Sequence, residues 1–98
     1  MTPELEVRHA ELGRDGTFYI ERDGERLAEQ VYFKSHDGKI ATIAHTEVAE
    51  ALQGHGIARK LTLAAVAWAR ATGMKIDPVC PFARAVFARD PSIADVRA

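Results

Sequence analysis

The chain has 98 residues, 47% of them hydrophobic and 28% charged, a balance typical of one small globular domain rather than of a disordered segment. A formal net charge of -1 argues against nucleic-acid binding, and no apolar run approaches the roughly 20 residues of a membrane span or forms a signal peptide. A single cysteine excludes an intrachain disulfide and is too few for a zinc cluster, so we expect a cytoplasmic domain over residues 1–98 with no metal site.

The first half of the chain reads as a series of strands. Alternating apolar and polar residues predict a strand over residues 5–10, and residues 13–16 turn the chain. Residues 17–22 are rich in strand formers, and Asp23 and Gly24 form a two-residue hairpin turn into a strand over residues 26–34. A turn over 36–38 leads to a further strand over 39–46. We therefore expect an antiparallel meander.

The apolar spacing changes to a helical period at residue 57. It predicts a helix over residues 57–72, with Gly73 placed as its C-terminal cap. Residues 75–79 read as a strand, so the strand, helix, strand order predicts a right-handed crossover with parallel pairing. Pro78 cannot donate to a ladder, so pairing is expected to end or splay near it. The fold class is therefore α+β with a mixed sheet.

A second, shorter helix is predicted over residues 81–89. Pro81 suits the first helical position, and Asp90 with Pro91 ends the helix. Residues 92–98 give no clear pattern.

The segment between the fourth strand and the first helix has the pattern Q-x-x-G-x-A over residues 53–58. Gly54 and Gly56 let backbone N–H groups turn inward without a β-carbon in the way, and the helix dipole favours an anion at this end. Arg59 and Lys60 lie in the first helical turn, where cations are otherwise unfavourable. We favour a phosphate-binding loop over simple turn glycines.

Three segments in order resemble one family: H-T-E-V at residues 45–48, the loop at 53–58, and C-P-F at 80–82. They resemble a short, single-cysteine branch of the GNAT superfamily of N-acetyltransferases over residues 5–91. The resemblance implies a minimal GNAT-like fold that uses acetyl-coenzyme A to acetylate an amine on a small molecule, peptide or protein. It assigns coenzyme A contacts to the strand end, the loop and the first helical turn: Thr46, Val48, Gln53, Gly54, His55, Gly56, Ile57, Ala58, Arg59 and Lys60.

Cys80 immediately precedes Pro81, so it occupies the N-cap of the second helix. The dipole there favours a thiolate, and the side chain is expected to point at the ligand space of the loop. The alternative is a small buried hydrophobe at a strand end. The resemblance tips the balance toward two chemical roles, acceptor of the acetyl group or acid for the departing thiolate. Many GNAT enzymes use a tyrosine as that acid, but no tyrosine follows Tyr32 in this chain.

His45 and Glu47 are two residues apart on a strand and therefore point to one face. Either side chain is a candidate general base for the attacking amine. The alternatives are a core histidine bonded to backbone and a solvated loop carboxylate. Elsewhere, Trp68 is expected in the core, and Arg84 and Arg89 lie near the expected cleft.

Two other phosphate-binding patterns do not fit. A dinucleotide fingerprint needs a third small residue where Arg59 stands, and a P-loop needs G-K-[ST] after the glycines. A more serious alternative keeps the fold but loses the activity, leaving a coenzyme A binding or interaction module. In either case we expect a monomer or a weak homodimer.

Overall fold

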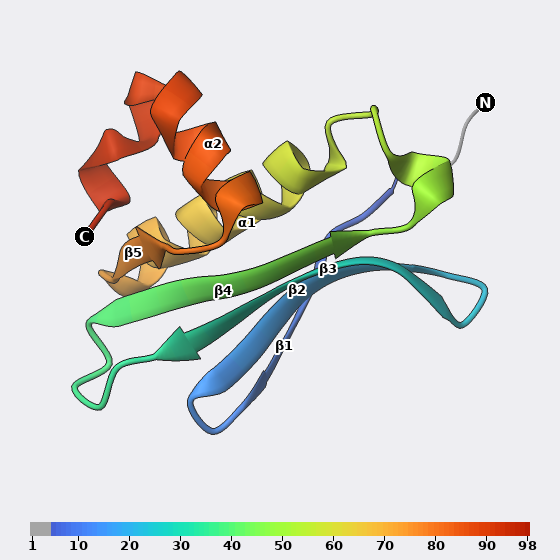
Figure 1. The fold of residues 1–98 in the computed structure, drawn as a ribbon. Helices are drawn as coiled ribbons and strands as arrows, with labels where there is room; N and C mark the ends of the chain where they lie inside the picture. The colour runs from blue at the N-terminus through green and yellow to red at the C-terminus, as the bar shows by residue number, and fades with distance from the viewer. Residues whose placement is uncertain (1–4) are drawn as a thin grey trace.

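The computed structural model describes residues 5–98, so the first four residues of the expected domain lie outside the described range. Four strands run antiparallel in chain order: β1 (Arg8–Leu12), β2 (Asp15–Arg22), β3 (Glu25–Lys34) and β4 (Ile40–Val48). The predicted meander is therefore confirmed, and Figure 1 shows it along the lower side of the molecule.

The first strand lies later in the chain than predicted. β1 begins at Arg8 rather than at residue 5, because a two-residue turn after Leu12 pairs that residue with Asp15 and thereby fixes the register. Leu5 and Val7 precede the strand and are partly buried against the core. The alternation of apolar and polar residues before Arg8 therefore reflects burial of these two side chains, and not pairing in the sheet.

The second half contains α1 (Ile57–Thr72), β5 (Lys75–Pro78) and α2 (Pro81–Arg89), and the two helices have the predicted boundaries. Gly73 has a φ of 72° and caps α1 as expected. β5 pairs in parallel with the first part of β4, from Ile40 opposite Lys75 to Ile43 opposite Pro78. The α+β class and the parallel crossover are both confirmed.

The chain continues through a 3-10 helix, η2 (Pro91–Val96), that the sequence did not reveal. Ile93 and Val96 from this helix are buried in the core. Arg70 of α1 holds the segment by a bidentate pair with Asp95, with Nη2 to Oδ1 at 2.7 Å and Nε to Oδ2 at 3.1 Å. The final residues are thereby placed beside β5, where the Ala98 amide donates to a β5 carbonyl.

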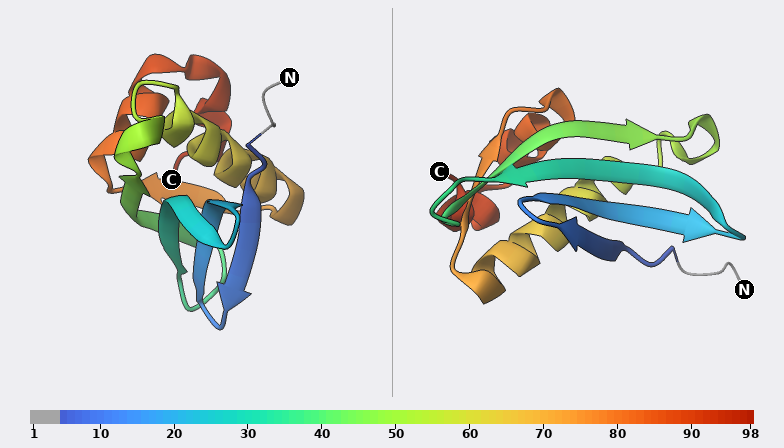
Figure 2. Two further views of the ribbon diagram at one scale, coloured as in Figure 1. Left: turned by 90° about the vertical axis from the view of Figure 1, so that its right-hand side faces the viewer. Right: turned by 90° about the horizontal axis from the view of Figure 1, so that it is seen from below.

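Both long helices lie on one side of the sheet, and the other side is uncovered (Figures 1 and 2). Inward side chains such as Ile20, Ile43 and Ile76 are fully buried against α1 residues such as Leu61 and Val66. No helix among residues 5–98 is long and apolar enough to cross a bilayer.

The end of α1 packs on an aromatic cluster made by His9, Phe18, Tyr32 and Trp68. The Tyr32 and Trp68 rings are 4.7 Å apart between centroids, and His9 stacks on Phe18 at 4.2 Å. The core position predicted for Trp68 is confirmed, although its side chain is only partly buried.

Candidate functional site

β4 contains a bulge just before its last residues. Val31 of β3 pairs with His45, whereas Tyr32 pairs with Ile43, so Ala44 is the extra residue. Beyond the bulge Thr46 is buried toward the helices, while His45 and Glu47 are exposed.

Pairing between β4 and β5 stops where Pro78 predicted it would. The amides of Val79 and Cys80 both donate to the Ile43 carbonyl, at 3.2 and 2.9 Å, and no strand pairs with this edge of β4 beyond that point among residues 5–98. The last part of β4 therefore has an open edge.

The register identifies which backbone groups face that open edge. The Ala49 amide donates to the Leu27 carbonyl at 2.7 Å, so these two residues form a hydrogen-bonded pair of the antiparallel ladder. Hydrogen-bonded pairs alternate with pairs whose polar groups point away from the partner strand. Thr46 and Val48 belong to the second kind, so their N–H and C=O groups are directed to the open edge.

The loop after β4 brings the start of α1 toward the same edge. It contains a short 3-10 helix, η1 (Glu50–Leu52), and the side-chain Nε2 of Gln53 donates to the Val48 carbonyl at 3.2 Å. Gly54 and Gly56 have φ values of 82° and 71°, and a β-carbon at either residue would meet only open space. Gly56 is the N-cap of α1 and provides no side-chain cap, so the first N–H groups of the helix remain available.

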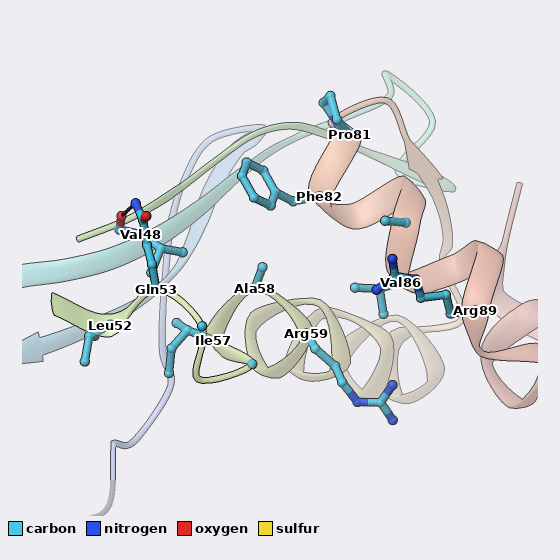
Figure 3. Close-up of a pocket in the computed structure, with 13 residues that line it drawn as sticks. Val48, Leu52, Gln53, Ile57, Ala58, Arg59, Pro81, Phe82, Val86 and Arg89 are labelled. Atoms are coloured by element: carbon cyan, nitrogen blue, oxygen red, sulfur yellow. Dashed lines mark hydrogen bonds between the residues drawn. The ribbon is translucent and has the colours of Figure 1, made fainter. Parts of the chain in front are cut away.

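A hollow of about 620 Å³ lies between β4, this loop and α2 (Figure 3). Phe82 points from α2 toward Val48 and Gln53 on the opposite side. The lining is mostly apolar, and seven of its residues are predicted contacts: Val48, Gln53, Gly54, Gly56, Ile57, Ala58 and Arg59. Six further residues complete it: Leu52, Pro81, Phe82, Ala85, Val86 and Arg89. The predicted contact Thr46 is not part of this lining.

The cations of the first helical turn already have protein partners. Arg59 lines the hollow, but its guanidinium is directed to Asp90, with Nη2 3.4 Å from Oδ2. Lys60 donates to the Leu5 carbonyl and is not part of the lining, and neither is His55. Hydrogen bonds from Ser92, with a smaller contribution from Arg59, lower the pKa of Asp90. Arg89 of α2 does line the hollow, as predicted for a residue near the cleft.

Cys80 is the N-cap of α2, as predicted, but its side chain makes no capping hydrogen bond. The expectation that it points into the ligand space of the loop is wrong, because Cys80 is 2% exposed and does not line the hollow. Its Sγ instead donates to Thr46 Oγ1 at 3.1 Å, beneath β4. The interaction with the inward face of the strand turns the thiol away from the loop.

Sequence reasoning missed two buried polar residues behind Thr46. Gln30 Nε2 donates to Thr46 Oγ1 at 3.2 Å and to Thr62 Oγ1 at 2.9 Å. Both residues occupy inward positions of their elements and are fully buried. A polar residue at a position that the alternation assigns to the core was the available signal.

His45 and Glu47 share the uncovered face of the sheet, with His45 Nε2 3.7 Å from Glu47 Oε2. Their side chains are 60% and 71% exposed, so the alternative of a core histidine is wrong. Glu47 also lines a second hollow of about 440 Å³ together with Arg26, Glu29 and Glu50. Within residues 5–98, no group of three side chains is arranged to hold a metal ion.

Comparisons with known proteins agree on one family. Residues 17–96 match the family model described as GCN5-related N-acetyl-transferase. The chain is similar to the solution structure of a GCN5-like candidate N-acetyltransferase from Staphylococcus aureus, with 34% identity, coverage of 96% of this chain and 88% of that chain, and a TM-score of 0.72. It is also similar to an IAA acetyltransferase from Bacillus cereus, with 32% identity, coverage of 65% and 43%, and a TM-score of 0.54.

A more distant structure shares the fold alone. It is an aminoglycoside N-acetyltransferase, solved in complex with CoA, that is 14% identical to this chain. The alignment covers 83% of this chain and 67% of that chain, with a TM-score of 0.57. No curated protein matches the chain at a significant level.

Proposed function

The chain belongs to the GCN5-related N-acetyltransferase family, and from this premise we propose that it transfers an acetyl group from acetyl-coenzyme A to an amine. The observation that carries the proposal is the meeting of two sets of backbone groups beside one hollow. Thr46 presents its N–H and C=O groups along the open edge of β4, and Val48 presents its N–H group there, since its carbonyl accepts from Gln53 Nε2. The start of α1 presents its N–H groups behind Gly56.

The residues at this hollow fit the two halves of coenzyme A. A diphosphate is an anion, and the uncapped N–H groups after Gly56 provide donors and a favourable dipole for it. The pantetheine arm contains amides, and Thr46 and Val48 offer the strand-like hydrogen bonds that an amide chain can complete. Phe82 and Val86 supply apolar contacts for its methylene groups.

The amine acceptor is proposed to approach from the uncovered face of the sheet. His45 and Glu47 are exposed there, and each can remove a proton from an ammonium group before the nitrogen attacks the acetyl carbon. The carboxylates of Glu29, Glu47 and Glu50 around the second hollow favour a cationic acceptor, such as a small amine or the side chain of a peptide lysine.

Cys80 is proposed to take part from beneath β4. Its thiol can accept the acetyl group, in which case a bond from Sγ to the acetyl carbon forms as the coenzyme thioester bond breaks. It can otherwise give its proton to the departing coenzyme thiolate. Both roles need a small movement at the start of α2, because Cys80 is buried behind the lining.

The burial of Cys80 also favours a second candidate, a coenzyme A binding module without catalysis. Incubation with acetyl-coenzyme A and a set of amines separates the two. The acetyltransferase releases free coenzyme A thiol in an amine-dependent manner, and its Cys80→Ala variant binds the coenzyme equally well but turns over more slowly. Calorimetric binding without any thiol release would favour the module, and absence of binding would overturn both.

A further inference from the structure

The helices α1 and α2 carry four arginines, and three of them are held by protein partners. Arg59 and Arg70 form ion pairs with aspartates, and Arg84 donates to a backbone carbonyl at 3.1 Å. The fourth, Arg89, lies in the last turn of α2, and its guanidinium makes no ion pair or hydrogen bond within residues 5–98. Arg89 nevertheless lines the large hollow. An unpaired cation in a mostly apolar wall is suited to an anionic ligand.

The charged residues in the lining of this hollow are both cations. They are Arg59 and Arg89, and none of the described residues that line it is acidic. Asp90 follows Arg89 in the chain, but its carboxylate already accepts from the Ser92 amide and from Arg59. The walls of the hollow therefore carry positive charge that no lining residue neutralises.

The hollow follows one face of α2. The lining residues from this helix are Pro81, Phe82, Ala85, Val86 and Arg89. Positions 82, 85, 86 and 89 share a helix face and extend about two turns, or roughly 10 Å, along the axis. Phe82 lies at the end beside Val48, and Arg89 lies at the other end (Figure 3). The hollow therefore has an aromatic end at β4 and a basic end.

The basic end is linked to the start of α1. Asp90 Oδ2 lies 3.4 Å from Arg59 Nη2, so the residue after Arg89 contacts the first turn of α1. The N–H groups behind Gly56, which are proposed to hold the diphosphate, belong to that turn. In coenzyme A the diphosphate joins the pantetheine arm to a ribose that carries a third phosphate at its 3′ position. With the pantetheine arm at the β4 end, the part of the lining left for the ribose phosphate is the end of α2.

We propose that Arg89 binds the 3′-phosphate of the coenzyme ribose and thereby selects coenzyme A over acyl carriers that lack this group. This role of Arg89 rests on the coenzyme A site of the proposed function. A phosphate monoester carries a charge of about -1.5 to -2 at pH 7 and has three acceptor oxygens. The planar fork of an arginine donates to two such oxygens at once, and Arg89 gives up no protein partner to do so.

Two other roles for Arg89 lead to different results. A cation in the last turn of α2 can stabilise that helix through its dipole. Arg89 can also bind the diphosphate, together with the start of α1. The first role changes folding stability and not the choice of ligand, and the second changes the affinity for every ligand with a diphosphate. Only contact with the 3′-phosphate makes the contribution of Arg89 depend on that group.

Calorimetry at low salt with coenzyme A and with 3′-dephospho-coenzyme A separates these roles, because the two ligands differ in the 3′-phosphate alone. The wild-type protein should bind coenzyme A about tenfold more tightly, as expected for one charge-assisted contact. Arg89→Gln should weaken coenzyme A binding by about tenfold and leave the affinity for 3′-dephospho-coenzyme A unchanged. Arg89→Lys should keep part of the preference, since it retains the charge and loses the fork.

Arg84→Gln is the matched control, because Arg84 lies on the same helix but outside the lining. It should keep the wild-type preference. Equal wild-type affinities for the two ligands, an equal loss of preference in Arg84→Gln and Arg89→Gln, or an Arg89→Gln variant that weakens both ligands equally or neither, would overturn the proposal. If Arg89→Gln fails to fold, the wild type and Arg89→Lys decide: a wild-type preference that is reduced in Arg89→Lys supports the proposal, and any other result overturns it.

The same experiments keep this role of Arg89 apart from the proposed function. A protein that prefers coenzyme A through Arg89 but transfers no acetyl group to an amine would refute the proposed function alone. A protein that transfers the acetyl group but binds the two ligands equally would overturn the role of Arg89 alone. Failure to bind either ligand would overturn both.

Discussion

The phenol ring of Tyr32 lies directly over Gly16, so close that a β-carbon on Gly16 would come within 2.1 Å of the Tyr32 Cζ atom. Both residues belong to paired strands, and Gly16 is opposite Tyr32 in the register of β2 and β3. The glycine is needed here for space and not for an unusual backbone angle. It allows the ring to reach the aromatic cluster under Trp68.

Gly16→Ala is therefore expected to destabilise the protein by about 1–3 kcal/mol, because the ring must move out of its place in the core. Urea unfolding followed by circular dichroism measures this loss. The same substitution should cost much less in a Tyr32→Leu background, where the ring is absent. Equal losses in the two backgrounds would contradict the steric explanation.

The stability of the fold is expected to fall in mild acid through His9. Burial lowers the pKa of His9, and the nearby Glu11 only partly opposes this effect. The unfolded chain then binds more protons than the folded one, so stability is fully present above the ordinary value of 6.5 and is lost as pH falls through the folded pKa.

A series of urea midpoints between neutral pH and pH values near 5 tests this. The loss of stability between these pH values should be smaller in His9→Gln than in the wild type. His55→Gln changes an exposed histidine of the loop and should show the same loss of stability as the wild type. Glu11 adds a loss at lower pH, because the hydrogen bond from Tyr32 lowers the pKa of this carboxyl. A His9→Gln profile that follows the wild type would rule out His9 as the source.

Gly56→Ala is expected to weaken coenzyme A binding by about tenfold, because the new methyl group enters the space in front of the α1 N-terminus. Alanine is also strained at positive φ, by about 1–2 kcal/mol. Gly13→Ala is the matched control, since Gly13 has a φ of 62° and open space around it but lies in the turn between β1 and β2. Calorimetry should find wild-type affinity in Gly13→Ala, and equal weakening in both variants would refute the loop assignment.

Asp90→Asn is expected to strengthen coenzyme A binding by about two- to threefold at low salt, because it releases Arg59 from its ion pair. An asparagine oxygen can still accept from the Ser92 amide, so the start of η2 should be preserved. The gain should disappear in an Arg59→Gln background and at high salt. Unchanged affinity at low salt would mean that Arg59 does not reach the phosphates.

Much of this architecture could be predicted because the informative residues act locally. Asp23 with Gly24, Gly73, and Pro81 specify a hairpin, a helix end and a helix start through their own backbone preferences. The place where β4 and β5 separate also followed from one proline. The family followed from three short segments, and the family model supports it.

What could not be predicted depended on contacts distant in sequence. The direction of the Cys80 side chain follows from Thr46 on β4, and the pairing of Arg59 follows from Asp90 beyond α2. η2 has no clear periodicity, and its place is set by Arg70 of α1 and by its two buried apolar residues. Whether the predicted site residues bind and react as proposed remains a prediction.

The extra residue Ala44 determines which side chains at the end of β4 face the helices and which face the uncovered side of the sheet. Thr46 faces the helices, on the side of the proposed coenzyme A site, whereas His45 and Glu47 face the uncovered side, where the amine is proposed to approach. The two proposed substrates would therefore be separated by the thickness of a single strand. Deleting one residue upstream would exchange all of these side chains together. Redesign of acceptor preference in this protein is therefore expected to succeed by substitution and to fail by changes in strand length.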